Sequence, residues 1–326
     1  MPRLAVTDST TFEPLAEEHL EGAAVLLAAR HAVGRRVEPA LDPRYEEPDA
    51  ARVEIAALLA REGASGVVAL YAGDVVGYLV GVPLDELWGP NIWVEPAGHA
   101  ASAPELVRDL YGAAAAVWVA EGRTSHYAMV PTTDPELVDA WFRVGFGHQH
   151  VHAIREPLDA APAPPEGLIV RRAQREDIDA LARAELSLGE HQVLSPVFSQ
   201  VGPPPFEEAR AEWDEDFDDP TYTTFVAERE GTVLGSAIGC AIEASSMHRS
   251  LALPRGAGFL GFAAVLPEHR GLGAGRVLGE TILAWAKDAG YPAVVTDWRM
   301  TNLLSSRTWP RLGFRPTFFR LFRAIG

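Results

Sequence analysis

A cluster of glycines and arginines in the second half of the chain has the composition of an anion-binding loop. An apolar stretch, 262–265, ends at Pro267 and is followed by Arg270-Gly271-Leu272-Gly273-Ala274-Gly275-Arg276, after which a helical pattern continues to Gly290. The first N–H groups of a helix lack partners within it and attract anions. Glycines let these groups approach a phosphate closely, and arginines add positive charge. The spacing predicts a strand, a loop that holds a diphosphate and a helix from Ala274; a turn that needs glycine only for its shape is the alternative.

Two other nucleotide-binding motifs are excluded. Gly256, Gly258 and Gly261 fit the spacing G-x-G-x-x-G, but a dinucleotide loop follows a strand and opens a helix. Here Pro254 precedes the glycines and a predicted strand follows them. No Gly-Lys-Ser/Thr sequence completes a triphosphate-binding loop. These glycines therefore do not indicate a nicotinamide cofactor or a nucleoside triphosphate.

Three side chains are candidates for a general base. Asp297 ends an apolar stretch after the long helix, Glu243 ends another stretch before the glycine loop, and His248 follows in a loop. Carboxylates and imidazoles at strand ends can take a proton from an attacking group. An ordinary polar residue at the surface is the favoured interpretation of each.

Two charged segments flank these motifs. The first is acidic and would attract a cationic amine, or would be a solvated face of a helix. It contains Glu212, Asp214, Glu215, Asp216, Asp218 and Asp219. The second, 299–326, has six arginines and no carboxylate, and it either contacts phosphates near residue 307 or balances the acidic body of the protein.

Four residues with metal-binding or nucleophilic side chains have plain structural interpretations. His148, His150 and His152 alternate, so they share one face of a strand. A zinc site is conceivable there, but polar residues on a sheet surface are the favoured interpretation. Cys240 lies within an apolar strand pattern and is expected to be a buried small side chain rather than a nucleophile. We expect no metal.

A proline-rich segment divides the chain into two halves that resemble each other. Residues 157–167 contain four prolines and predict a linker between domains 1–156 and 168–326. Hairpin patterns recur at an offset of 158 (227 − 69), and the pair Trp141/Phe146 recurs as Trp309/Phe314 at 168. A third landmark aligns 93–96 with 264–267 at 171. Strands and helices alternate in each half, which predicts two α/β domains that arose by duplication.

Composition limits the classes of function. The 326 residues carry a formal charge of −17 (28 − 45), which disfavours nucleic acid as a partner. The sequence shows neither a secretion signal nor an apolar run of about 20 residues, so we expect no membrane association. The single cysteine, Cys240, indicates a reducing compartment, and a cytoplasmic location is expected.

These motifs resemble those of the GNAT superfamily of N-acetyltransferases. The glycine loop is similar to the superfamily's acyl-CoA motif, and Asn302, Ser305, Trp309 and Gly313-Phe314 are similar to its second motif. The resemblance extends more weakly over both halves. It implies two tandem GNAT-like domains, each a mixed, mostly antiparallel sheet flanked by helices.

The resemblance assigns cofactor-binding roles to particular residues. Backbone groups of 263–265 would pair with the pantetheine arm and polarise the thioester carbonyl. Amides of 270–275 would hold the pyrophosphate, with Arg276 beside them. Asn302 would contact the pantetheine. The residues so assigned are Ala263, Ala264, Val265, Arg270, Gly271, Leu272, Gly273, Ala274, Gly275, Arg276, Asn302, Ser305 and Trp309.

The sequence departs from the family pattern in two places. Trp309 stands where the family has a tyrosine that protonates the leaving thiolate, and indole cannot supply that proton. In the first half, residues 93–104 keep a strand and a proline but lack the arginine and the repeated glycines. We therefore expect the first domain to be degenerate, without a CoA site.

Together these features predict an acetyl-CoA-dependent N-acetyltransferase. A primary amine of a small molecule or peptide would attack the thioester directly in a ternary complex, with Asp297 and Glu243 as candidate bases. A non-catalytic acyl-CoA-binding or interaction protein is the alternative, and hydrolysis or transfer to a hydroxyl stays open. The sequence also leaves the oligomeric state open, a homodimer included.

Overall fold

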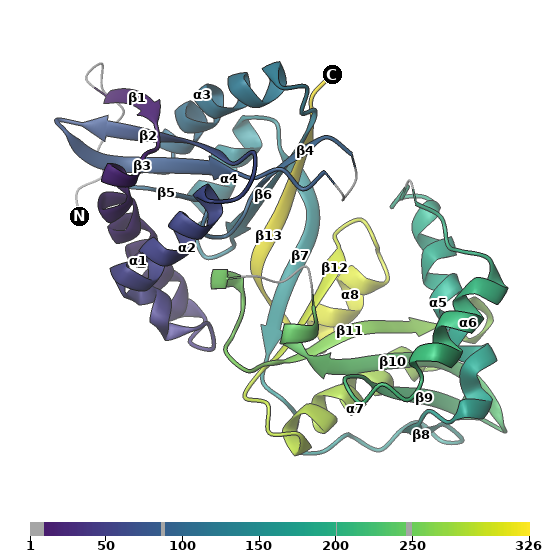
Figure 1. Ribbon diagram of the computed structural model, residues 1–326. Helices are drawn as coiled ribbons and strands as arrows, with labels where there is room; N and C mark the ends of the chain where they lie inside the picture. Colours follow the sequence, from purple (N-terminus) through teal and green to yellow (C-terminus); the bar gives the residue numbers. More distant parts are fainter. Residues whose placement is uncertain (1–9, 86–88, 200, 246–249) are drawn as a thin grey trace. The chain divides into compact units, whose positions relative to one another are not determined.

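The computed structural model describes residues 10–85, 89–199, 201–245 and 250–326, and these fold into two compact units (Figure 1). The first unit takes the described parts of 1–152, 249–255 and 316–326, and the second takes those of 153–248 and 256–315. None of the helices in these described ranges combines the length and the apolar character that a bilayer-crossing helix needs.

The first unit is built on two groups of strands. An antiparallel sheet has the order β1 (Thr10–Pro14), β2 (Ser65–Tyr71), β3 (Asp74–Gly81) and β5 (His99–Ala101). In the other group, β6 (Ser125–Pro131) pairs in parallel with β4 (Asn91–Val94) and antiparallel with β13 (Arg315–Ala324). The next strand in the chain, β7 (Gly147–Arg155), begins in this unit.

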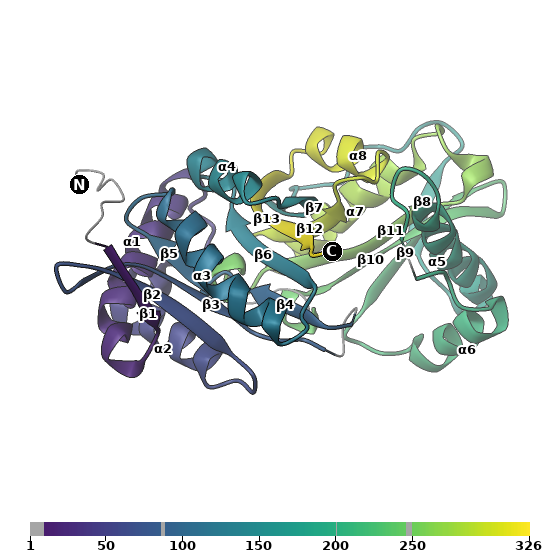
Figure 2. The same cartoon turned by 90° about the horizontal axis from the view of Figure 1, so that it is seen from above.

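Helices cover both faces of the first unit's sheet. On β3, Tyr78 and Val80 pack with α1 (Leu20–Val37) and α2 (Pro48–Leu59). Leu79 points to the opposite face, toward α3 (Leu106–Ala120) and α4 (Pro135–Arg143). Val76 joins Leu79 there because it is the extra residue of a β-bulge: Ala69 pairs with Gly77 while Leu70 pairs with Val75. Figure 2 shows α3 lying across β2 and β3. The alternation of strand side chains therefore divides this core into two layers.

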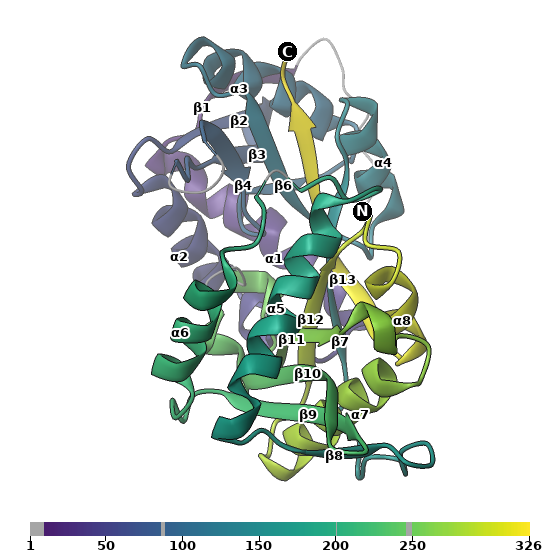
Figure 3. The same ribbon diagram turned by 90° about the vertical axis from the view of Figure 1, so that its right-hand side faces the viewer.

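The second unit repeats this plan around one sheet. Its strand order is β12 (Val294–Arg299), β11 (Gly258–Val265), β10 (Thr232–Ala241), β9 (Thr223–Arg229) and β8 (Ile169–Arg172). On one face lie α5 (Ile178–Val193) and α6 (Phe206–Asp216), and α7 (Ala274–Asp288) packs on the other (Figure 3). The short helix α8 (Ser305–Arg311) follows β12.

Two of the three predicted landmarks of the duplication are confirmed. The hairpins β2–β3 and β9–β10 correspond at the offset of 158. Trp141 and Trp309 each accept through their carbonyl the N–H of the phenylalanine five residues later, past a glycine with positive φ. The fold is therefore an α/β domain used twice.

The third landmark is wrong. Leu79 pairs with His99, and its counterpart Ala237 (79 + 158) pairs with Ala263. The partner strands therefore correspond at an offset of 164 (263 − 99) rather than the predicted 171. The shared proline misleads because it stands on opposite sides of the corresponding strands: Pro96 precedes β5, whereas Pro267 follows β11. Five positions separate Ala101 from the start of α3, whereas nine separate Val265 from the start of α7.

The division of the chain into the two units does not follow the predicted linker. Residues 157–167 have no regular secondary structure and belong to the second unit, as does the end of β7. The last eleven residues of the chain, 316–326, belong to the first unit. The reason is the ladder between β13 and β6, which joins Phe318–Ala324 to Ser125–Pro131.

Candidate functional site

Strand β11 parts from its neighbour β12 halfway along its length. Its ladder with β10 runs from Gly258 to Val265, but its parallel ladder with β12 ends at Leu260, opposite Thr296. Gly261 is the extra residue of a β-bulge, because Ile238 pairs with Phe262 while Gly239 pairs with Leu260. Residues 261–265 therefore present a strand edge beyond the end of the β12 ladder, where an extended arm of a ligand can add.

The predicted glycine loop follows this edge directly. Gly271 and Gly273 have φ of +82° and +88°, a conformation that favours glycine, and Gly273 is the N-cap residue of α7. No side chain caps this helix, so its first N–H groups face outward from the loop. A Cβ added at Gly271 would meet open space, and one at Gly275 would touch only Val265, at 3.4 Å. The loop thus has room for an anion at an uncapped helix end.

Two exposed arginines and part of the linker border the loop. Arg270 donates through Nε to the carbonyl of Val265 at 3.3 Å, and the Nε of Arg276 lies 3.5 Å from Glu280 Oε2. The ring of Pro165 lies beside Gly273, 3.2 Å from where a Cβ would be. Nearer the other end of α7, Lys287 pairs with Asp159 at 2.9 Å. The linker therefore follows α7 back to the loop.

The second motif places its residues at the start of α8 and against α7. Asn302 is 3% exposed, and its Oδ1 accepts the N–H groups of Leu304 at 3.1 Å and Ser305 at 3.3 Å. Trp309 is 7% exposed and lies against α7 at Gly279, where an added Cβ would be 3.2 Å from the indole ring. Asn302 therefore caps α8, and Trp309 joins α8 to α7.

The candidate bases occupy different places in the second unit. Asp297 is half-buried on β12, one residue beyond the last rung with β11, where the two strands part. Glu243 is exposed in the turn after β10, whose last residue pairs with Gly258 at the opposite end of β11. Along the strand this is on the order of 15 Å from the bulge. His248 lies outside the described residues.

One residue near the site was missed by sequence reasoning. His191, in the last turn of α5, approaches Asn302: its Nε2 lies 3.3 Å from Asn302 Oδ1. The two residues are 111 positions apart, and no local pattern around His191 indicates the contact. Only the packing of α5 over β10 and β11 brings them together.

The acidic segment is partly neutralised by its neighbours. Arg175 pairs with Asp214 at 3.0 Å and with Asp218 at 2.5 Å. Trp213 donates through Nε1 to Glu185 at 2.7 Å, and burial raises the pKa of that carboxyl. The segment therefore joins α6 to α5 and to the turn that precedes α5, in addition to carrying negative charge.

Several of the C-terminal arginines have structural partners. Arg320, 3% exposed, donates through Nε to Gln149 and lies over the ring of Trp93. Arg323 lies over Tyr111 and donates to the carbonyl of Val144 at 2.6 Å. These two side chains belong to the packing of the first unit.

In the first unit, side chains close the place that corresponds to the β11 edge. His99, the counterpart of Ala263, is fully buried, and its Nε2 lies 3.0 Å from the carbonyl of Met129 on β6. Tyr78 donates its hydroxyl to the carbonyl of Ala97 at 2.7 Å. Arg30 of α1 donates to the carbonyls of Pro96 and His99. The strand edge is thus bridged by an imidazole and tied to α1.

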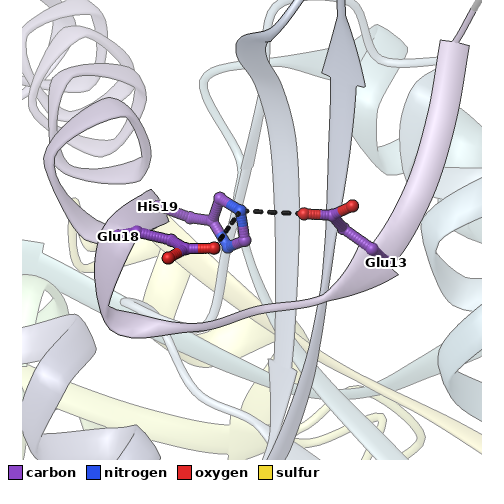
Figure 4. A group of neighbouring side chains, drawn as sticks. All are labelled: Glu13, Glu18 and His19. Atoms are coloured by element: carbon purple, nitrogen blue, oxygen red, sulfur yellow. Dashed lines mark ion pairs between the residues drawn. The ribbon is translucent and has the colours of Figure 1, made fainter.

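Two of the metal and cysteine candidates, His148 and Cys240, take part in packing. His148 lies between the rings of Phe142 and Phe319, at 4.9 and 4.2 Å between centroids. Within the described ranges, the one group of three possible ligands is Glu13, Glu18 and His19 (Figure 4). Cys240 is buried, and burial raises the pKa of its thiol to about 11, which confirms it as a small core side chain.

The geometry of the His19 group is that of a hydrogen-bonded turn. Nδ1 of His19 accepts the N–H of Ala16 at 3.1 Å, so a neutral ring carries its proton on Nε2. That nitrogen lies 3.0 Å from Glu13 and 3.8 Å from Glu18 (Figure 4). A protonated nitrogen cannot ligate a metal, so these contacts describe hydrogen bonding rather than a metal site.

Comparison with known proteins adds one family match and several structural likenesses. Residues 191–314 match the model of the "Acetyltransferase (GNAT) family". None of the curated proteins compared matches the chain. Among solved structures, a GCN5-related N-acetyltransferase from Sphaerobacter thermophilus is 16% identical with a TM-score of 0.57, over 98% of this chain and 97% of the other.

Two further solved structures are similar over nearly all of this chain. A tandem GNAT protein from the clavulanic acid biosynthesis pathway is 18% identical with a TM-score of 0.48, over 97% of this chain and 99% of its own. A glucosamine N-acetyltransferase region of a fungal multi-domain β-N-acetylglucosaminidase is 16% identical with a TM-score of 0.50, over 97% of this chain and 38% of its own. At such identities, the likenesses with TM-scores of 0.57 and 0.50 speak for the fold alone and carry no information about the substrate.

Proposed function

We propose that this protein is an acetyl-CoA-dependent N-acetyltransferase, because residues 191–314 match the model of the GNAT family and the fold of the chain is similar to that of a GCN5-related N-acetyltransferase. Its second unit would bind acetyl-CoA, and the acetyl group would pass to a primary amine of a small molecule or peptide in a ternary complex. The first unit would bind no CoA.

One observation carries the proposal: the strand edge and the anion loop are consecutive on one chain segment. Residues 261–265 offer backbone groups to an extended arm, and the uncapped start of α7 follows within ten residues. Pantetheine is an extended chain with two amides, and a diphosphate ends it. The residues present fit such a ligand, because open space surrounds Gly271, and Gly271 and Gly273 have no side chains of their own that would cover the start of α7.

The chain's own groups supply two parts of the chemistry. A backbone N–H of 263–265 would polarise the thioester carbonyl, where negative charge develops as the amine attacks. Asp297 would accept the amine's proton, directly or through water, because it stands where β11 and β12 part. Glu243 is the second candidate, although its turn lies at the other end of β11.

A conservative change at Asp297 tests the assignment of the base. We expect Asp297→Asn to lower kcat by about 100-fold or more while the affinity for acetyl-CoA stays unchanged. Glu243→Gln made in parallel serves as the comparison, and pH–rate profiles of both variants identify which carboxylate titrates. Unchanged kinetics for Asp297→Asn would remove it as the base.

Three side chains support the proposal that the first unit has no CoA site. His99, Tyr78 and Arg30 occupy the corresponding strand edge or hydrogen-bond to its backbone. The first unit's turn into α3 is also shorter and has neither the arginine nor the glycines. Calorimetric titration of the whole chain should therefore give one equivalent of acetyl-CoA. Two equivalents would contradict this part of the proposal.

Trp309 supports a second candidate function, that of a non-catalytic acyl-CoA-binding protein. Its buried indole ring stands where the family has a proton-donating tyrosine. Thioester consumption measured across a panel of amines and peptides, with mass spectrometry of the acceptors, separates the two. An acetylated amine supports the enzyme, whereas saturable acetyl-CoA binding without turnover on any acceptor favours the binding protein.

A further inference from the structure

The contact between His191 and Asn302 has a defined direction. A carboxamide oxygen only accepts hydrogen bonds, so His191 must donate to it through Nε2–H. The same oxygen also accepts the N–H groups of Leu304 and Ser305. Three donors converge on Oδ1, and this fixes which way the carboxamide is turned.

The fixed carboxamide leaves its Nδ2 group as a donor for another partner. Asn302 is 3% exposed, so its side chain is held in packed surroundings rather than turning freely in water. With Oδ1 committed to the helix start and to His191, the two N–H bonds of Nδ2 lie in the amide plane on the edge away from Oδ1.

The position of Asn302 relates it to the open edge of β11. Strands β11 and β12 are parallel, so their carboxyl ends lie at the same end of the sheet. Asn302 follows β12 by three residues and donates its N–H to the carbonyl of Arg299 at 2.9 Å. It therefore stands at the end of the sheet where β11 passes into the glycine loop.

We infer that His191 is a positioning residue for the cofactor arm: its Nε2–H holds the carboxamide of Asn302 so that Nδ2 is presented to a carbonyl of bound pantetheine. The inference rests on the proposed function, because it requires acetyl-CoA to bind along β11. His191 comes from α5, on the face of the sheet opposite α7, so it links a helix that does not form the anion loop to the binding of the arm (Figure 3).

Calorimetric titration with acetyl-CoA tests this in the full-length protein. His191→Leu removes the donor at similar volume, and we expect affinity to fall about 3- to 10-fold. His191→Gln keeps an N–H donor at similar reach and should stay within about twofold of the unmodified protein. Glu190→Leu alters the neighbouring exposed position and is the matched control for changes at the helix end.

A double-mutant cycle separates positioning from a general packing role. Asn302→Ala alone should weaken binding, and adding His191→Leu to it should have no further effect, because the group that His191 positions is gone. Thermal melts of each variant report whether it is folded. The inference would be overturned if the two changes weakened acetyl-CoA binding additively, or if His191→Gln and His191→Leu lost the same affinity. Either result would leave the proposed function intact. No binding to the unmodified protein would overturn both.

Discussion

Corresponding positions in the two units carry different side chains, and the difference decides whether the strand edge is accessible. His99 and Ala263 occupy the same rung, opposite Leu79 and Ala237. The imidazole of His99 reaches the carbonyl of Met129, whereas the methyl group of Ala263 leaves the edge clear. On the next rung, Tyr78 stands where the second unit has Ser236. Internal hydrogen bonds therefore occupy this strand edge in the first unit.

Burial of His99 makes a pH-dependent contribution to stability. Its pKa is lowered from 6.5 to about 3, first by burial and then by the charge of Arg30. Below pH 6.5 the imidazole takes up a proton in the unfolded chain but not in the folded one. The folded state therefore becomes less stable as the pH is lowered from about 6.5 to 3. The contribution lost between pH 7 and pH 5 is about 2 kcal/mol.

Urea unfolding at pH 7 and pH 5 checks this for His99→Gln, whose amide can still donate to Met129. We expect the drop in unfolding free energy between the two pH values to be about 2 kcal/mol smaller in this variant. His31, His126 and His148 also have pKa values lowered by burial and contribute equally to both proteins. Identical pH dependence in the two proteins would contradict the account.

At the scale of residues, features that depend on a local sequence pattern could be predicted, whereas contacts between distant segments could not. The glycine loop, the helix from Ala274 and the buried Cys240 could be predicted because their evidence lies within a few residues. The role of His99 could not, because a proline shared at another offset hides its true counterpart. The contact between His191 and Asn302 depends on how α5 crosses the sheet, which no short pattern encodes.

At the scale of elements, α8 depends on a close approach to α7. Gly279 lies in the middle of α7, and a Cβ there would be 2.7 Å from Leu312 and 3.2 Å from Trp309. A larger residue would push apart the helices that position Asn302 and the glycine loop. The glycine is therefore needed for packing rather than for backbone conformation.

A pair of glycine substitutions tests this packing. Gly279→Ala should destabilise the protein by about 1–3 kcal/mol, because the added methyl group overpacks the interface. Gly112→Ala, in α3, meets no atom within 4 Å and should stabilise by up to about 1 kcal/mol through helix propensity. Urea unfolding of both variants measures the change in the free energy of unfolding, which should have opposite signs in the two. A stabilising Gly279→Ala would show that the helices are not in contact there.

At the scale of the whole molecule, the end of the chain completes the first unit. Strand β13 pairs with β6 over seven residues, and its Phe318 and Leu321 are almost fully buried. Composition alone predicts an irregular proline-rich segment, but the two units divide before it, between His152 and Ala153. The partner of β13 could not be predicted, because strand pairing between segments almost 200 residues apart leaves no local signal.

Truncation after Arg315 tests this arrangement. Removal of 316–326 leaves the edge of β6 unpaired and exposes its apolar neighbours, so limited proteolysis should cleave within residues 10–152 much sooner than in the full chain. A synthetic peptide of residues 316–326 added in excess should restore protection. Unchanged protection of the truncated protein would contradict the strand assignment.

The most direct test of the central claim is calorimetric titration of acetyl-CoA into two matched glycine variants. Gly271 and Gly290 lie beyond opposite ends of α7, both with φ of +82° and open space around an added Cβ, so aspartate strains the backbone equally at either position. The account predicts at least about tenfold weaker binding for Gly271→Asp, because its carboxylate repels the phosphates, and unchanged binding for Gly290→Asp. Equal affinity in the two variants, or no binding to the unmodified protein, would contradict it.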